Sequence, residues 1–344
     1  MTTALALHPF ISSISVSASA TPALLSLRVA SVREIAADVC LFELHAVDGA
    51  PLPPWTPGAH IRLHLPGDMA RSYSLCNTPH ERDGYRIAVK REAASRGGSS
   101  YLHEHVLEGD VIVATAPANA FALADDQRAP LLLAAGIGIT PIYAMAAALA
   151  DAGRSHRLHY FARGLQHAAF FDALARREEG LSMHLGLDVA ETQAAIRAAL
   201  AASPAGTPLY VCGPSPFIEA VREAARKGGW RDADVHFELF SAPASAVPNA
   251  ANNSVQDTFE LVLQRSGVHC TVQPGQSIVA AAAGAGVHIA TSCGEGFCGS
   301  CESVVLDGEP AHRDSVLSAA ERAAGRRIMP CVSRCTGPRL VLDL

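Results

Sequence analysis

The 344-residue sequence lacks an 18-residue apolar run and an excess of positive charge. Its formal net charge is −6, and no cluster of Lys and Arg is interleaved with aromatic residues, which make up only 6% of the chain. A polyanion would therefore meet no basic surface, so we expect no nucleic-acid partner. Because no run is long and apolar enough to cross a bilayer, we expect a soluble protein with no membrane contact. Nine cysteines with reactive spacing fit the reducing cytoplasm.

The N-terminal stretch lacks the basic residues that open a secretory signal. Residues 1–24 are small, apolar and rich in Ser and Ala. A signal peptide would carry positive charge ahead of its apolar part. We therefore expect residues 1–24 to form a flexible tail.

Three of the nine cysteines fall in a short glycine-rich loop. Cys293, Cys298 and Cys301 are separated by four and by two residues, and Cys331 follows 30 residues after Cys301. This is the spacing of plant-type 2Fe-2S proteins. Four cysteines also suit zinc, but structural zinc sites usually pair two short C-x2-4-C knuckles and this chain has one. Cys335 is an alternative fourth ligand. The spacing between the preceding helix and the two cysteines favours Cys331.

The residues around these cysteines predict a small α+β domain over residues 258–344. Gly294, Gly296 and Gly299 let the loop wrap tightly and point N–H groups at sulfide and thiolate charge. Strand-like runs form a hairpin before the loop, Ser277 caps a short helix, and residues 301–306 return as a strand. Ser318 and Glu321 make a capping box for one more helix, which Gly325 ends. The preceding residues 241–257, rich in Ala, Ser, Pro and Asn, predict a linker.

The first hundred residues after the tail have the pattern of a β-barrel. Short β-type runs are split by turn residues at an even spacing, which is typical of an antiparallel barrel. The runs cover residues 25–32, 39–45, 60–65, 71–76, 85–90 and 110–114.

The fourth run contains Arg71-Ser-Tyr-Ser, a candidate ligand-binding strand. Alternation places Arg71 and Tyr73 on one face, where a cation and a phenol can meet the same ligand. Lys90 follows in the next run. Gly97, Gly98 and Ser99 then open a helical turn whose free N–H groups suit a phosphate.

From Pro130 onwards, strand-like runs alternate with helical stretches, and this pattern predicts a parallel, doubly wound sheet. A buried run over residues 131–135 leads into Gly136 and Gly138, and Thr140 and Pro141 are placed to act as N-cap and first helical residue. Gly136, Gly138 and Thr140 are therefore candidate cofactor-binding residues, because the helix dipole would face a ligand held by this loop, although a lone G-x-G turn is often only structural. Further strand-like runs at residues 158–162, 182–187 and 209–212, separated by helical stretches, strengthen the assignment.

Two later features of this region bear on a nucleotide. Cys212-Gly213-Pro214 ends a strand, where ligands of such sheets bind, although Gly-Pro is also a common helix start. Arg163 follows the second strand, where a carboxylate would hold a ribose 2′-OH, so the choice between NADH and NADPH stays open.

These motifs resemble ferredoxin-NADP reductase-like flavoproteins. Their order, with the ferredoxin last, resembles the phthalate dioxygenase reductase and vanillate demethylase reductase family. The resemblance implies a flavin held by Arg71, Tyr73 and Ser74 with Lys90 nearby, and a flavin phosphate at Gly97, Gly98 and Ser99. It places Cys212, Gly213 and Pro214 beside the nicotinamide. It also makes Cys212 and Phe240 candidate catalytic residues, with Phe240 covering the flavin, although a strand-end Phe can equally serve core packing.

The resemblance further implies three domains and an electron path. These are an FMN-binding antiparallel β-barrel (residues 25–125), an α/β NAD(P)-binding domain (126–240) and a β-grasp 2Fe-2S ferredoxin domain (258–344). FMN is favoured over FAD because the Lys90 to Ser99 stretch resembles the FMN branch. The chain would pass electrons from NADH through FMN and the cluster to a Rieske-type oxygenase, acting as a monomer. A donor to a haem-thiolate monooxygenase, a diaphorase-like reductase and a redox sensor are the alternatives.

Overall fold

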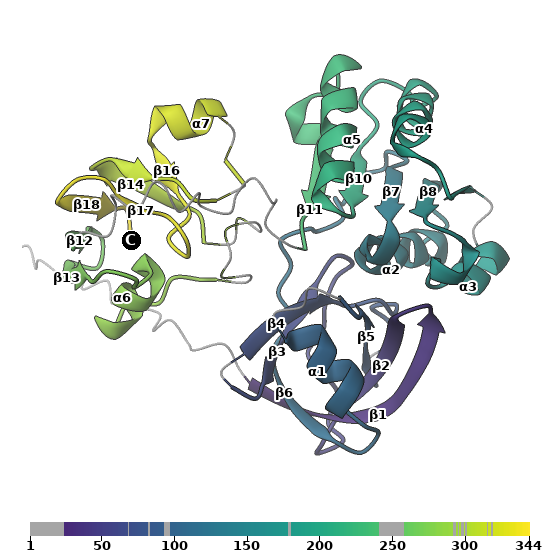
Figure 1. Ribbon diagram of the computed structural model, residues 1–344, viewed down its shortest axis with the longest axis horizontal. Coiled ribbons are helices and arrows are strands. Elements are labelled where there is room, and N and C mark those ends of the chain that lie inside the picture. Colours follow the sequence, from purple (N-terminus) through teal and green to yellow (C-terminus); the bar gives the residue numbers. More distant parts are fainter. Residues whose placement is uncertain are drawn as a thin grey trace, which may run out of the picture.

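The computed structural model contains three main sheets that share no strand (Figure 1). It describes residues 24–240 and 258–344, except for residues 68, 82, 93–96, 178–179, 292–293, 295, 297–298, 300, 315 and 318. The expected linker and nearly all of the expected tail lie outside the described residues. Each main sheet has its own buried cluster of apolar side chains, so each forms its own core.

The first sheet is a six-stranded antiparallel barrel, as the even spacing of β-type runs predicted. Its strand order is β4-β3-β6-β1-β2-β5. A bridge from Leu75 to Ile87 joins the end of β4 to β5 and closes the sheet. Inward side chains such as Ile61 and Leu63 are fully buried. The elements are β1 (Leu24–Ala36), β2 (Val39–Ala46), β3 (His60–Leu65), β4 (Met69–Ser74), β5 (Tyr85–Lys90), α1 (Gly98–His105) and β6 (Val111–Thr115).

One strand of the barrel lies earlier than predicted. The sequence pattern indicated a strand over residues 71–76, whereas β4 ends at Ser74. The two residues beyond it turn from β3 towards β5, because the backbone N–H of Leu75 bonds to Ala59 and that of Cys76 bonds to Arg86. Closing the barrel therefore ends the strand.

The second sheet is parallel and doubly wound, with strand order β11-β10-β7-β8-β9. Its topological switch point lies between β7 and β10, from which the chain runs outwards in both directions. Side chains of α2 and α3 pack in one core cluster with one face of the sheet, and those of α4 and α5 pack in another with the opposite face. The elements are β7 (Leu131–Ala135), α2 (Ile139–Asp151), β8 (Arg157–Ala162), α3 (Phe171–Arg177), β9 (Leu181–Leu185), α4 (Val189–Ala201), β10 (Leu209–Cys212), α5 (Ser215–Lys227) and β11 (Val235–Glu238).

The prediction that Thr140 caps α2 is wrong. A 3-10 turn over Gly136–Gly138 leads directly into the helix, so Gly138 is the N-cap residue and Thr140 already lies inside the first turn. The Thr140 hydroxyl instead donates a hydrogen bond to the carbonyl of Ile137 at 3.1 Å. Pro141 is the third helical residue, where its missing N–H still costs no intrahelical bond.

The third sheet forms the expected α+β unit. Its strand order is β13-β12-β18-β14-β16, with β12 and β18 parallel. The Ser277 side chain caps α6 by accepting a hydrogen bond from the N–H of Ala280 at 3.1 Å, as predicted. Ser318 lies outside the described residues. The elements are β12 (Phe259–Leu263), β13 (Val268–Val272), α6 (Ile278–Gly284), β14 (Ser303–Asp307), β15 (Pro310–Ala311), α7 (Ala319–Ala324), β16 (Arg327–Ile328), β17 (Arg334–Cys335) and β18 (Arg339–Leu342).

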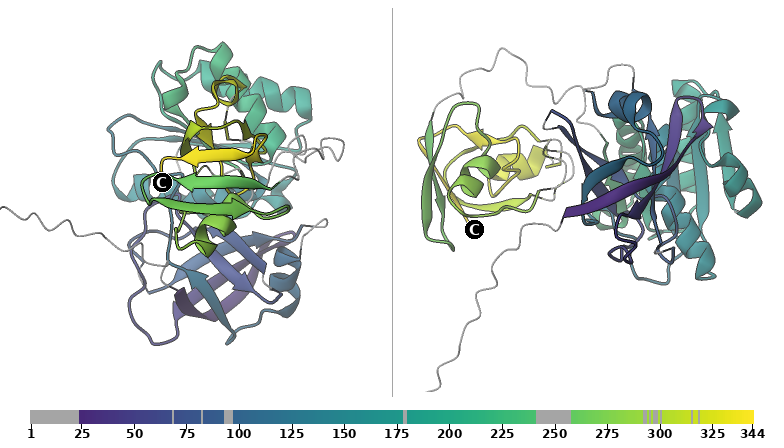
Figure 2. Two further views of the ribbon diagram at one scale, coloured as in Figure 1. Left: turned by 90° about the vertical axis from the view of Figure 1, so that its left-hand side faces the viewer. Right: turned by 90° about the horizontal axis from the view of Figure 1, so that it is seen from below.

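This third unit stands to one side of the barrel (Figure 2). Its cysteine loop lies close to the barrel, since a Cβ built on Gly294 would be 3.9 Å from Nη2 of Arg62 on β3. Within the barrel sheet, β4 pairs with β3, so the strand that carries Arg71 and Tyr73 neighbours the one that reaches the cysteine loop.

Candidate functional site

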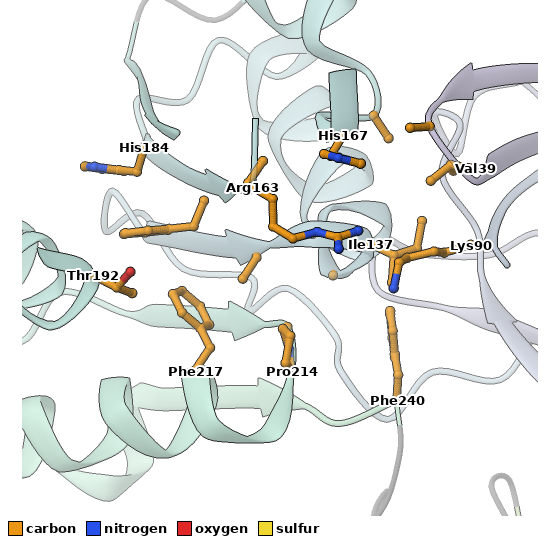
Figure 3. Close-up of a pocket in the computed structure, with 18 of the residues that line it drawn as sticks. Val39, Lys90, Ile137, Arg163, His167, His184, Thr192, Pro214, Phe217 and Phe240 are labelled. Atoms are coloured by element: carbon orange, nitrogen blue, oxygen red, sulfur yellow. The ribbon is translucent and has the colours of Figure 1, made fainter. Parts of the chain in front are cut away.

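A cleft of about 510 Å³ lies between the barrel and the parallel sheet (Figure 3). Val39 and Lys90 line it from the barrel, and Phe240 lines it just beyond β11. The last residues of β7 and β8, together with the turns that follow β7, β8 and β10, contribute most of the rest. These turns stand at the carboxyl ends of parallel strands, where doubly wound sheets bind their ligands.

The two turns at the switch point need glycine for packing. A Cβ on Gly138 would lie 2.3 Å from the carbonyl oxygen of Cys212, and one on Gly213 would lie 2.8 Å from Cβ of Ala135. No side chain fits at such distances, so the turns after β7 and β10 approach each other backbone to backbone. Gly136 differs, because it has a φ of +55° and a Cβ there would meet nothing within 4 Å.

The residues predicted to hold a flavin phosphate come together beside β4. The side chain of Arg71 passes so close to Gly98 that a Cβ there would lie 2.6 Å from its Cγ. Gly97 is the N-cap of α1 and has a φ of 96°, which glycine adopts without strain. The Ser99 hydroxyl accepts a hydrogen bond from the N–H of Glu92, whose carboxylate pairs with Lys90 at 2.6 Å. Arg71 and the first turn of α1 therefore form a compact cationic corner that fits one phosphate.

Arg71 and Tyr73 share a face, as predicted from alternation. In the register with β3 they stand opposite Leu63 and Ile61, which are fully buried. Burial raises the pKa of the Tyr73 phenol to about 12, so it stays neutral at physiological pH. A neutral ring next to a guanidinium suits a flat, polar heterocycle such as a flavin.

A carboxyl group that the sequence reasoning missed links the barrel to the parallel sheet. The Ser74 hydroxyl donates a hydrogen bond to Oε2 of Glu238 at 3.4 Å, and Nδ1 of His60 lies 4.0 Å from Oε1. The Glu238 side chain is only 12% exposed. Burial raises its pKa to about 8, against the opposing effect of the Ser74 hydrogen bond. The sequence did contain one sign of this residue, because an acidic residue stands at the end of a predicted strand, two residues before Phe240.

Cys212 lies behind the cleft and does not line it. Its side chain is fully buried, and in the sheet it stands opposite Glu238. Burial, reinforced by the charge of Glu238, raises the thiol pKa well above its usual value, so the thiol stays protonated. Thr140 is buried too and takes no part in the lining. Gly213, Pro214 and a 37% exposed Phe240 do face the cleft.

Two of the four predicted metal ligands are described, and their thiols meet. Sγ of Cys301 lies 3.3 Å from Sγ of Cys331. A disulfide would need about 2.05 Å, whereas two thiolates bound to one tetrahedral metal at ~2.3 Å are separated by about 3.8 Å. The pair therefore fits two ligands of the same iron. Cys293 and Cys298 lie outside the described residues.

The surroundings of this thiol pair also suit a cluster. Gly294, Gly296 and Gly299 have φ values of 68°, 75° and 75°, so the loop wraps through conformations that other residues adopt at a cost. Cys335 is buried in β17, where its thiol donates to the carbonyl of Arg339 at 3.3 Å. That bond supports Cys331 as the fourth ligand.

Within the described part of the chain, no helix combines the length and the hydropathy needed to span a bilayer.

Comparisons with protein families match two parts of the chain. Residues 261–336 match the 2Fe-2S iron-sulfur cluster binding domain. Residues 112–235 match the N-terminal domain of dimethylamine monooxygenase subunit DmmA-like proteins.

Several known proteins are similar over most of this chain. Oxidoreductase NdmD of Pseudomonas putida is 41% identical over 86% of the chain, which spans only 50% of that protein. Vanillate O-demethylase oxidoreductase of Pseudomonas putida is 42% identical, with 92% of this chain and 98% of that protein covered. Phthalate dioxygenase reductase of Burkholderia cepacia is 38% identical, with 93% and 97% covered.

Solved structures agree in fold. Phthalate dioxygenase reductase, described as a modular structure for electron transfer from pyridine nucleotides to 2Fe-2S, matches with a TM-score of 0.67 and 37% identity. The match covers 93% of this chain and 98% of that one. An intact type IV self-sufficient cytochrome P450 monooxygenase matches with a TM-score of 0.75 and 36% identity, but the match covers only 41% of its length.

Proposed function

Because this chain belongs to the reductase family that includes phthalate dioxygenase reductase and vanillate O-demethylase oxidoreductase, we propose that it passes electrons from NADH to a terminal oxygenase. It is an oxidoreductase that uses FMN, a 2Fe-2S cluster and NADH. The observation that carries the proposal is the bond from Ser74 to Glu238. It ties the strand that would face the flavin to the strand that ends beside the nucleotide cleft.

The residues divide the work of binding between two sites. Arg71 and the first turn of α1 would hold the flavin phosphate, and Tyr73 would contact the flavin ring. Phe240 lines the cleft, where it would shield the flavin from water. Lys90, Gly136 and Gly213 line the cleft that receives the dinucleotide.

The flavin, when bound, accepts a hydride and releases electrons singly, as a cluster requires. The chain itself places two neutral, protonated side chains near the site of this electron transfer. The Cys212 thiol stays protonated, and Glu238 holds a proton over much of the physiological range because its pKa is about 8. Neither group opposes the approach of electron-rich rings with a fixed negative charge.

The partner proposed here is a Rieske-type oxygenase, which accepts electrons one at a time. Two of the similar proteins are named for a dioxygenase and a demethylase. We take the chain to act as a monomer in the cytoplasm, where reduced thiols persist to bind iron.

A second candidate partner is a haem-thiolate monooxygenase. The self-sufficient cytochrome P450 carries a region that matches 93% of this chain at 36% identity, and in that protein it is part of a monooxygenase. The reductase chemistry is the same in both cases, so only the acceptor distinguishes them.

Anaerobic mixing with NADH tests the proposal. We expect flavin absorbance to bleach first and cluster absorbance to follow, with two electrons taken up per NADH. Adding a purified Rieske-type oxygenase should then reoxidise the cluster, and a cytochrome P450 in a parallel experiment identifies the other partner. If NADH bleaches neither chromophore, the proposal is wrong.

A further inference from the structure

Arg62 on β3 brings a positive charge to the cysteine loop of the third unit. A Cβ built on Gly294 would lie 3.9 Å from Nη2 of Arg62. In the sequence, Gly294 directly follows Cys293, a predicted ligand of the cluster. The neighbours of Arg62 in β3, Ile61 and Leu63, are fully buried, so alternation directs the Arg62 side chain to the outside of the barrel. The guanidinium therefore lies at the loop and not in the barrel core.

The backbone of Arg62 is fixed within the barrel, next to the strand that would hold the flavin. Its N–H donates a hydrogen bond to the Thr115 hydroxyl on β6 at 3.2 Å. In the register with β4, Arg62 stands opposite Ser72, which lies between Arg71 and Tyr73. Adjacent strands of a sheet are about 4.8 Å apart. A single strand spacing therefore separates the residue at the cysteine loop from the proposed flavin-binding strand.

The third unit depends on surface contacts for its position beside the barrel (Figure 2). Within the described residues, its core cluster contains only residues from 259 to 344, and the barrel cluster contains none of these. Domains that share no core generally move relative to one another unless their interface is large and apolar. A charged contact at the cysteine loop can therefore decide how closely the loop approaches the barrel.

The charge of Arg62 is complementary to that of a cluster in this loop. In an oxidised 2Fe-2S centre, the negative charge of the thiolates and sulfides exceeds the positive charge of the ferric irons. Each electron that enters adds to this negative charge. Opposite charges attract more strongly where protein replaces water between them. Arg62 therefore attracts the loop in both oxidation states, and more strongly after reduction.

We propose that Arg62 is a positioning residue that holds the cysteine loop against the barrel while electrons cross from the flavin to the cluster. The inference rests on the proposed function, because it takes both cofactors to be bound. NADH supplies the electrons in pairs. In each crossing, the reduced flavin loses one electron and one ferric ion becomes ferrous, and no bond forms or breaks. Because Arg62 stabilises the added negative charge, it also raises the reduction potential of the cluster.

The first test follows the Arg62→Gln holoprotein by stopped-flow spectroscopy after mixing with NADH. Flavin bleaching should keep its wild-type rate, whereas the cluster reduction that follows should slow by about 10- to 100-fold, as expected when a reacting group is misplaced. Added salt screens the attraction, so it should slow cluster reduction in the wild type and have little effect on the variant. Arg62→Lys keeps the charge and should retain most of the rate and its dependence on salt.

The reduction potential of the cluster provides a readout that does not depend on turnover. In a redox titration followed by electron paramagnetic resonance, Arg62→Gln should shift the midpoint to a more negative value, and Arg62→Lys should stay close to the wild type. A role in packing alone would leave the potential unchanged. Arg33→Gln, at an exposed position of β1 opposite Leu41, is the matched control and should change neither the rate nor the potential.

The other outcomes would overturn the inference or the proposed function. Wild-type cluster reduction and a wild-type potential in Arg62→Gln would show that Arg62 does not position the loop. Equal slowing in Arg62→Gln and Arg62→Lys would show that its charge is not the cause. Normal reduction of the cluster with slower transfer to a purified Rieske-type oxygenase would place Arg62 at the partner instead. If NADH bleaches no flavin in the wild type, it is the proposed function that fails.

Discussion

Ser74 in the barrel and Glu238 in the parallel sheet are 164 residues apart in the chain, yet the Ser74 hydroxyl lies 3.4 Å from the Glu238 carboxylate. Their bond spans the boundary between two separately formed sheets. Glu238 is the last residue of β11, and Phe240, two residues further on, lines the cleft. The pair therefore joins the proposed flavin site to the proposed nucleotide site through one buried carboxyl group.

Glu238 should make the stability of the flavin-binding part depend on pH. Its folded pKa of about 8 lies above its usual 4.5, so folding favours the protonated form. The stabilisation is complete below pH 4.5 and is lost as the pH rises through 8. Relative to Glu238→Gln, we expect the wild-type free energy of unfolding to fall by about 2–4 kcal/mol between pH 5 and pH 8, at about 1.4 kcal/mol per pKa unit.

Release of flavin fluorescence on unfolding measures this effect. Ser74→Ala removes the hydrogen bond that lowers the pKa of Glu238, so it should move the pH midpoint upwards. Glu219→Gln, on the exposed side of α5, is the control and should keep the wild-type pH profile. A profile for Glu238→Gln identical to that of the wild type would show that Glu238 is not the titrating group.

Extracted flavin should be FMN. Arg71 and the first turn of α1 make one compact phosphate site, which matches the single phosphate of FMN. Chromatography of the flavin released by denaturation identifies it. Recovery of FAD at one per chain would assign the protein to the other branch of the reductases.

Gly98→Ala should weaken flavin binding. The added Cβ would lie 2.6 Å from Cγ of Arg71 and 3.2 Å from its Nε, so the guanidinium must leave the phosphate corner. We expect the dissociation constant for FMN to rise about tenfold, as when one charge-assisted contact is lost. Flavin fluorescence titration of the apoprotein measures it. Gly284→Ala, where a Cβ meets nothing within 4 Å, should leave FMN affinity unchanged.

Cys331 rather than Cys335 should be required for the cluster. The Cys331 thiol lies 3.3 Å from that of Cys301, whereas the Cys335 thiol bonds to a backbone carbonyl in a buried strand. Cys331→Ser should therefore lose the cluster spectrum, and Cys335→Ala should keep it. Iron content per folded chain and electron paramagnetic resonance after reduction show which variant keeps the cluster. The opposite pattern would exchange the two assignments.

Cutting the chain after Phe240 should leave a working flavoprotein. The barrel and the parallel sheet share no strand with the third sheet, and each has its own core. The fragment should still take electrons from NADH and reduce ferricyanide from the flavin. It should fail with cytochrome c or a Rieske-type oxygenase, because those electrons leave through the cluster. Full-length rates with an oxygenase would show that the cluster is not the exit.

The sequence by itself determined the elements and motifs that depend on short-range order. Alternation predicted that Arg71 and Tyr73 share a face, because side-chain direction in a strand has a period of two residues. Ser277 could be recognised as a cap because its partner, the N–H of Ala280, is three residues away. The cysteine spacing indicated a cluster because the ligands of one metal centre lie mostly in one loop.

Only the tertiary structure decided which distant side chains meet. Whether Glu238 reaches Ser74 depends on how the sheet packs against the barrel, and no local pattern encodes that. The same holds for the closure from Leu75 to Ile87, which ends β4 at Ser74, two residues earlier than the sequence pattern predicted. Arg163 shows the limit most clearly. Its place after β8 could be read from the sequence, but the direction of its side chain along the cleft, towards Lys90 and Phe240, follows from the packing around the cleft.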